Sequence, residues 1–94
     1  MRWLEREDTI CCVVFLANHV YNNLSIDASI KEVIKHGVDK KEGSIKMKFS
    51  NIAALCDDYG LTVQTKMGRL ANYSVQNRIA FEDVLNTISN INKN

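Results

Sequence analysis

The side chains that could carry acid–base or metal chemistry are few and scattered along the 94 residues of the chain. The histidines, His19 and His36, lie in separate predicted helices without an acidic or cysteine neighbour at the spacing of metal ligands. The carboxylate pairs Asp57–Asp58 and Glu82–Asp83 are adjacent residues, which point about 100° apart on a helix and so cannot serve as acid and base on one face. Glycine-rich phosphate loops, G-x-S-x-G and H-E-x-x-H do not occur. We therefore expect a protein that is not an enzyme and holds no metal or other cofactor.

The cysteines give no sign of a metal site or a disulfide framework. They are three in number, two of them are the neighbours Cys11 and Cys12, and none forms a C-x-x-C pair. Cys11 and Cys12 are interpreted as small residues at the edge of the core rather than as reactive thiols. A reducing cytoplasm is the expected location.

The residues best suited to contact another macromolecule lie in and around the segment 43–55. Residues 31–48 contain six lysines against three acids, a local charge of +3, although the net charge of the whole chain is only +1. A low net charge is unusual for a strong nonspecific nucleic-acid binder, whereas a local basic segment is typical of a DNA-binding surface. The residues predicted to bind DNA or a protein partner are Lys40, Lys41, Ser44, Lys46, Met47, Lys48, Ser50, Asn51, Lys66 and Arg69.

Apolar residues recur at three- and four-residue spacing in four stretches of the chain. This pattern predicts an all-α, compact bundle of about four helices that forms a single domain over residues 1–94. No apolar run approaches the length of about eighteen residues that a membrane span needs, and no signal peptide is evident. The helices are expected at about residues 4–22, 25–36, 42–58 and 75–91.

Local signals mark the helix ends. Ser25 or Asp27 would cap the second helix and Ser74 the last one, while Gly37 and Gly60 would end the second and third helices. The core stripes are predicted from the periodicity as Ile10, Val13, Val14, Ala17, Val20 and Tyr21 in the first helix, Ile26, Ile30, Val33 and Ile34 in the second, and Ile79, Phe81, Val84, Leu85, Ile88 and Ile91 in the last.

The third helix has two distinct faces. Ile45, Phe49, Ile52 and Cys56 cluster within about 60° of a helical wheel and define its core face. The opposite face comprises Met47, Ser50, Asn51, Ala54 and Asp58. An outward methionine and alanine are unusual for a surface that meets only solvent, which suggests that this face contacts a partner.

Two regions outside the third helix leave alternatives open. Lys31 and Lys35 share one face of the second helix, which is either a solvated surface or a phosphate-facing one. Residues 60–73 have no clean period and predict an ordered, basic loop. A short β-like piece at 61–64 is compatible with the residue types but would have no partner strand.

The pattern Gly43-Ser44-Ile45-x-Met47-Lys48-x-x-Asn51-Ile52-Ala53-x-Leu55 resembles a segment of the small helical module that precedes the nuclease domain in many bacterial HNH endonucleases of restriction type. The similarity spans most of the chain, and only this central segment is specific. The family often has Arg-Ser/Thr-Pro before this helix, where this chain has Lys41-Glu42-Gly43. Further similar positions follow in the same order: Trp3, Glu5, Tyr21, Gly60, Leu61, Ser74, Asn77, Arg78 and Phe81.

The resemblance implies a helix-turn-helix or Myb/SANT-like unit that helps to hold double-stranded DNA, while cleavage belongs to a separate domain that this sequence does not contain. The N–H groups of Gly43–Ile45 and the Ser44 hydroxyl would bind a phosphate, and Asn51 would read an adenine. The lysines at 40, 41, 46 and 48 would neutralise backbone charge, with further contacts from Lys66 and Arg69. Roughly five phosphate contacts predict a slope of about −4 to −5 for log affinity against log salt.

A protein partner is the competing interpretation. In this reading the chain is a small interaction protein, such as a phage-encoded inhibitor or a defence-system subunit, and Met47 and Ala54 dock on the partner. The low net charge favours this interpretation, whereas the basic segment and the resemblance favour DNA. The sequence leaves the oligomeric state open.

Overall fold

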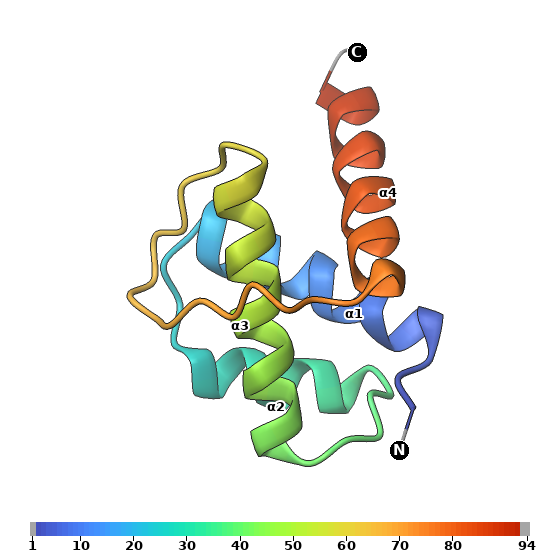
Figure 1. Cartoon of the computed structure of the whole chain (residues 1–94). Coiled ribbons are helices and arrows are strands. Elements are labelled where there is room, and N and C mark those ends of the chain that lie inside the picture. Colours follow the sequence, from blue (N-terminus) through green and yellow to red (C-terminus); the bar gives the residue numbers. More distant parts are fainter. Residues whose placement is uncertain (1, 93–94) are drawn as a thin grey trace.

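A computed structural model describes residues 2–92, and in this part of the chain the only regular elements are helices. The prediction of a small all-α bundle with about four helices is confirmed (Figure 1). A π-helical segment, η1 (Leu16–Val20), continues α1 without a break. The α-helices are α1 (Glu5–Phe15), α2 (Ile26–Lys35), α3 (Glu42–Asp58) and α4 (Val75–Asn92).

Helix α1 is the element on which the others pack. It runs behind α3 in Figure 1 and contacts α2, α3 and α4, while α4 starts beside α1 and projects beyond the rest of the molecule. Large apolar side chains that are fully buried between these helices form one core, in which the Phe15 and Phe49 rings lie 5.7 Å apart. The largest of them are Phe15, Phe49, Phe81, Leu16, Ile45, Ile52 and Leu55.

The inward face of α1 differs from the predicted one. Val13 and Tyr21 were expected in the core but are 49% and 60% exposed. The inward face instead carries Glu7 and Asp8 near its start, followed by the cysteines and Phe15. The periodicity argument failed here because it assigned every carboxylate to solvent, which rotates the assumed stripe away from the true one. Cys11 and Cys12 are accordingly fully buried and do not lie at the core edge.

Two buried ion pairs explain how acids can face the interior. Glu7 Oε1 lies 2.9 Å from Lys40 Nζ, and Asp8 Oδ1 lies 2.7 Å from Lys48 Nζ. The carboxylate of Glu7 also accepts hydrogen bonds from the N–H groups of Leu4 and Asp39. A charge buried without such partners would cost several kcal/mol. Separating either pair would therefore destabilise the fold.

Most predicted helix ends are confirmed. Ser25 rather than Asp27 caps α2, since its Oγ accepts a hydrogen bond from Ala28 N at 3.1 Å. Gly37 and Gly60 end α2 and α3 with φ of 101° and 76°, a conformation that side chains with a Cβ rarely adopt. Ile34 was predicted in the core stripe of α2, and this prediction is wrong because the residue is 42% exposed.

The π-helical turn after α1 brings two polar residues into the interior. The N–H of Tyr21 donates to the carbonyl of Leu16 at 3.0 Å, a π-type bond that widens the turn. As a result Asn18 and His19 both point inward, where Asn18 Nδ2 donates to Ser29 Oγ at 2.9 Å. This network joins the end of the first helix to α2.

Residues 59–74 form an ordered connection without a strand. Figure 1 shows this segment doubling back across the outer side of α3 to reach α4. Gln64 N donates to the carbonyl of His19 at 2.6 Å, and Leu70 N donates to the carbonyl of Ser50 at 3.1 Å. Half-buried Val63 packs against the core. The possible β-like piece at 61–64 is therefore pinned to η1 as irregular backbone.

Helix α4 starts where the capping signal predicted. Ser74 Oγ accepts a hydrogen bond from Asn77 N at 3.0 Å. Phe81 and Val84 are buried as expected, but Ile79 is 47% and Ile91 67% exposed. The stripe fails at Ile91 because the carboxyl end of the helix extends past the elements that cover it (Figure 1), whereas Ile79 lies in the first turns and lines an open hollow between α1 and α4.

Loss of one lysine should show how strongly the buried pairs hold the fold. Lys48→Met leaves Asp8 charged and unpaired in the interior, and we expect it to lower the free energy of unfolding by about 3–5 kcal/mol. The exposed neighbour offers a matched control, since Lys46→Met should change stability by less than about 0.5 kcal/mol. Urea unfolding followed by circular dichroism measures both. Equal effects of the two substitutions would contradict the structural role of the Lys48–Asp8 pair.

Candidate functional site

An open groove lies beside the amino-terminal half of α3. Its volume is about 580 Å³, which is in the range of sites that hold a small ligand or a segment of a polymer. The N-terminal segment, α3, the connection 59–74 and the start of α4 all contribute to its walls. The lining residues are Arg2, Trp3, Ser44, Met47, Lys48, Asn51, Asn72, Ser74 and Gln76.

The structure brings four of the ten predicted binding residues together in this groove, namely Ser44, Met47, Lys48 and Asn51. It also adds residues that sequence reasoning did not select. The cap signal at Ser74 was recognised, but only as a helix start. No local pattern shows that this residue and Arg2 border the same groove, because they come from opposite ends of the chain.

The first turns of α3 form an accessible part of this helix. Lys41 occupies the N-cap position and makes no side-chain cap, and Ser44 and Lys46 are exposed, as is Met47 at 60%. The N–H of Ile45 donates to the carbonyl of Lys41, so Ile45 does not belong to the open N–H groups that were predicted at Gly43–Ile45. The N–H groups of residues 42–44 have no acceptor within the helix.

The middle of the outer face of α3 is covered by the chain itself. Asn51 Nδ2 donates to the carbonyl of Leu70 at 2.8 Å and to Asn72 Oδ1 at 3.3 Å. Ser50 is half-buried under the same segment, and Ala54 is only 5% exposed. Asn51 therefore holds the connection in place with the amide group that was predicted to read an adenine.

Two of the predicted lysines point inward instead of outward. The side chains of Lys40 and Lys48 are only 9% and 7% exposed, and each lies in its ion pair with an acid of α1. Their charges are already compensated, so they add little to a field that could attract an external phosphate. The sequence reasoning missed this because it treated each lysine of the basic segment as solvated.

Trp3 connects the two ion pairs to the groove. Lys48 Nζ lies 4.6 Å and Lys40 Nζ 5.2 Å from the centroid of its ring, within the range of cation–π attraction. Gln76 Nε2 donates to the Trp3 carbonyl at 2.9 Å and to Asp8 Oδ2 at 2.8 Å. The wall of the groove formed by Trp3 and Gln76 is therefore rigidly attached to the buried network.

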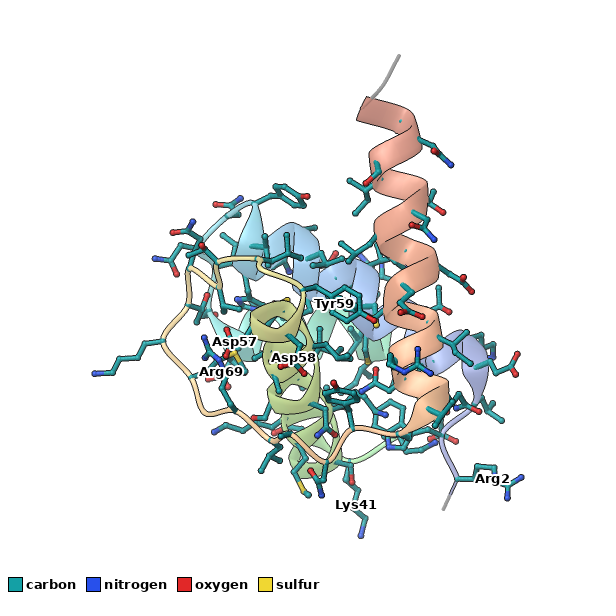
Figure 2. All side chains as sticks on the ribbon, turned by 45° about the horizontal axis from the view of Figure 1, so that its top comes forward. Arg2, Lys41, Asp57, Asp58, Tyr59 and Arg69 are labelled. Carbon is teal, nitrogen blue, oxygen red and sulfur yellow. The ribbon has the colours of Figure 1, made fainter. Side chains whose placement is uncertain are left out.

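The two basic residues of the connection differ in availability. Arg69 Nε lies 2.8 Å from Asp57 Oδ2, and Figure 2 shows this pair near the carboxyl end of α3, away from Lys41. Lys66 is exposed. Figure 2 also shows Arg2 and Lys41 pointing away from the body at the end of the molecule where α3 begins.

His19 is a buried structural histidine. Its Nδ1 lies 2.7 Å from Thr65 Oγ1 and its Nε2 lies 2.8 Å from Ser29 Oγ. Thr65 Oγ1 donates its own proton to Asn23 Oδ1 or to the Leu24 carbonyl, so it accepts from Nδ1 of His19. This assigns the proton of the neutral ring to Nδ1, and the Ser29 hydroxyl donates to Nε2. Desolvation favours this neutral form and lowers the pKa of His19.

The buried cysteine thiols are also structural groups. Burial, together with the nearby carboxylate of Asp8, raises the pKa of Cys11 to about 12, and burial also raises that of Cys56 to about 12. These thiols are poor nucleophiles because the thiolate is the reactive form. Among residues 2–92, no group of three or more His, Cys, Asp and Glu residues is placed to hold a metal ion.

No family model matches the sequence, and no curated protein or solved structure is significantly similar to it. Within the described residues, none of the helices combines the length and the apolar character that crossing a membrane requires.

Acid should destabilise the fold in two separate pH ranges. The stability that neutral His19 contributes is complete above its ordinary pKa of 6.5 and falls as the pH drops through its lowered folded pKa. Burial acts to raise the pKa of Glu7, but hydrogen bonds from Lys40 and from two backbone N–H groups together lower it from 4.5 to about 2. Its contribution is therefore complete above pH 4.5 and is lost as the pH falls towards 2.

Urea unfolding at a series of pH values measures both ranges. His19→Gln should flatten the upper range and leave the lower one, whereas Glu7→Gln should do the reverse. A free energy of unfolding that stays constant from about pH 7 to pH 3 would contradict both assignments.

Proposed function

We propose that this protein binds double-stranded DNA without catalysing a reaction on it, and that the amino-terminal turns of α3 are presented to the DNA. One observation carries the proposal. Lys41, Ser44, Lys46 and Met47 are all exposed on these turns, while Ile45 anchors the same stretch of helix in the core. A rigid, basic helix start with small and flexible side chains is suited to a DNA groove.

The arrangement of α2 and α3 supports this proposal. The two helices are joined by a short turn at residues 36–41, and α1 packs against both. In a helix-turn-helix protein the second helix enters the major groove with its first residues at the base edges. The resemblance of the segment 43–55 to the HNH-associated module points to the same helix.

The structure narrows the set of phosphate contacts that the proposal needs. Lys40, Lys48 and Arg69 are engaged in ion pairs, which leaves Lys41 and Lys46 on the first turns of α3, Arg2 in the groove and the exposed Lys66 of the connection as candidate contacts. About four contacts correspond to a slope of about −3 to −4 for log affinity against log salt, shallower than the sequence alone suggests.

Base contacts must also come from different residues than predicted. The amide N–H groups of Asn51 already bond within the chain, so Ser44 and Met47 replace it as the side chains that reach base edges. A serine hydroxyl can form a hydrogen bond with either a donor or an acceptor of a base edge, and an apolar side chain contacts the methyl group of thymine. Such contacts give modest discrimination between sequences.

A protein partner is the second candidate function, and one hollow favours it. A depression of about 330 Å³ lies between α1 and α4. Val75 and Ile79 line it and are 65% and 47% exposed, and Glu5 and Asp83 border it. An apolar floor with an acidic rim fits an amphipathic helix with basic residues. Ala54, in contrast, is covered and cannot serve as the predicted protein contact.

A charge-reversal pair tests the proposed DNA site. Lys41→Glu/Lys46→Glu should weaken the binding of duplex DNA by about tenfold or more at low salt and make the salt slope shallower by about 2, because two phosphate contacts are lost. Fluorescence anisotropy with a labelled duplex at several salt concentrations measures both values. The wild-type Kd at low salt should lie below about 100 μM.

The lysines of α2 provide a control with the same change in net charge. Lys31 and Lys35 are exposed and do not line the groove, so Lys31→Glu/Lys35→Glu should reduce affinity much less. Absence of wild-type binding at low salt would refute the proposal, and an equal loss in both double variants would refute a site centred on α3.

A further inference from the structure

We propose that the groove between the N-terminal segment, α3 and the start of α4 holds a phosphodiester backbone, and that Arg2, Ser44, Asn72 and Ser74 supply the hydrogen bonds to its phosphates. This inference rests on the proposed function and extends it from the helix start to a built channel for one strand. Three of these four residues were not among those predicted from the basic segment.

The charges around three hollows of the described surface distinguish this groove from the other two. The hollow between α1 and α4 includes Glu5 and Asp83 in its lining, and a third hollow includes Glu82 and Asp83. The lining of the groove contains Arg2 and no acidic residue, and the charge of its other cation, Lys48, is compensated by Asp8. Like charges in the other two hollows oppose an anion, so of these three hollows only the groove presents a phosphate with an uncompensated cation and no acidic lining residue.

Free donors in the groove match the chemistry of a phosphate. Ser74 Oγ accepts the bond from Asn77 N, which leaves its own proton to donate outward. Asn72 accepts through Oδ1 from Asn51, which leaves its NH₂ group to donate. Arginine, serine and asparagine side chains are common donors to backbone phosphates.

The wall of the groove is held in place by the buried network behind it. The NH₂ group of Gln76 donates to the Trp3 carbonyl and to Asp8, so Gln76 fixes the wall and does not donate to a ligand. Lys48 lies under the same wall in its ion pair with Asp8. Because Trp3 and Gln76 do not have to rearrange, a strand that enters the groove meets a fixed wall, which reduces the entropic cost of binding.

The groove is continuous with the proposed DNA-contacting turns of α3. Ser44 and Met47 belong to both surfaces, since they line the groove and lie on the exposed turns. A strand that leaves the base-contacting surface therefore passes directly between Ser44 and Ser74. The groove would hold the phosphates that flank the bases contacted by α3.

A substitution that keeps the fold can place a negative charge in the groove. Aspartate caps a helix as well as serine does, so Ser74→Asp should preserve α4 while repelling a phosphate. Ser25→Asp is the matched control, because Ser25 caps α2 in the same way and does not line the groove. Circular dichroism and urea unfolding should show that both variants remain folded.

Two titrations of each variant separate the groove from the proposed function. Trp3 is the only tryptophan of the chain and lines the groove, so its emission reports binding of a short oligothymidylate, which offers phosphodiesters without a duplex. Anisotropy reports binding of duplex DNA. We expect Ser74→Asp to weaken both by about tenfold or more and Ser25→Asp to leave both close to the wild type.

The outcomes are distinguishable. If the duplex binds and Ser74→Asp affects it no more than Ser25→Asp, the groove proposal is overturned and the α3 proposal stands. If the oligothymidylate binds in a Ser74-dependent manner but the duplex does not, the groove proposal is supported and duplex recognition is overturned. If neither nucleic acid binds, both are overturned.

Discussion

The buried pairing of Glu7 with Lys40 and of Asp8 with Lys48 is the interaction on which the arrangement of this protein depends. Each pair joins α1 to the turn before α3 or to α3 itself, and Gln76 adds the start of α4 to the same network. The desolvated charges tolerate few alternative positions, because separating them leaves an unpaired charge in the interior. The orientation of α3 relative to α1 follows from this constraint.

The network also decides which surface of α3 remains exposed. Lys48 is turned inward by Asp8, and the connection 59–74 is drawn across the middle of the helix, where Asn51 holds it. The first turns of α3 and the adjoining groove are left open, as are Asp57 and Asp58 at the carboxyl end of the helix. The proposed binding surface is thus small and fixed, with donors from residues far apart in the chain.

Helical periodicity was most reliable where helices have one apolar and one polar face. The core face of α3, with Ile45, Phe49 and Ile52, was predicted correctly because its spacing is unambiguous. The same argument misplaced Val13 in α1, since the buried acids there break the rule that apolar residues alone face inward. Ile91 was misplaced for a different reason, because α4 extends beyond the elements that could cover it.

The sequence by itself determined the four helices, most of their ends and the core face of α3, because capping, glycine conformation and periodicity act over only a few residues. Only the tertiary structure decided which lysines of the basic segment remain available, since their acidic partners lie about thirty to forty positions earlier in the chain. It also decided that Arg2, Ser44 and Ser74 border one groove. Contacts between segments so distant in sequence leave no local pattern, because they arise from packing that involves the whole chain.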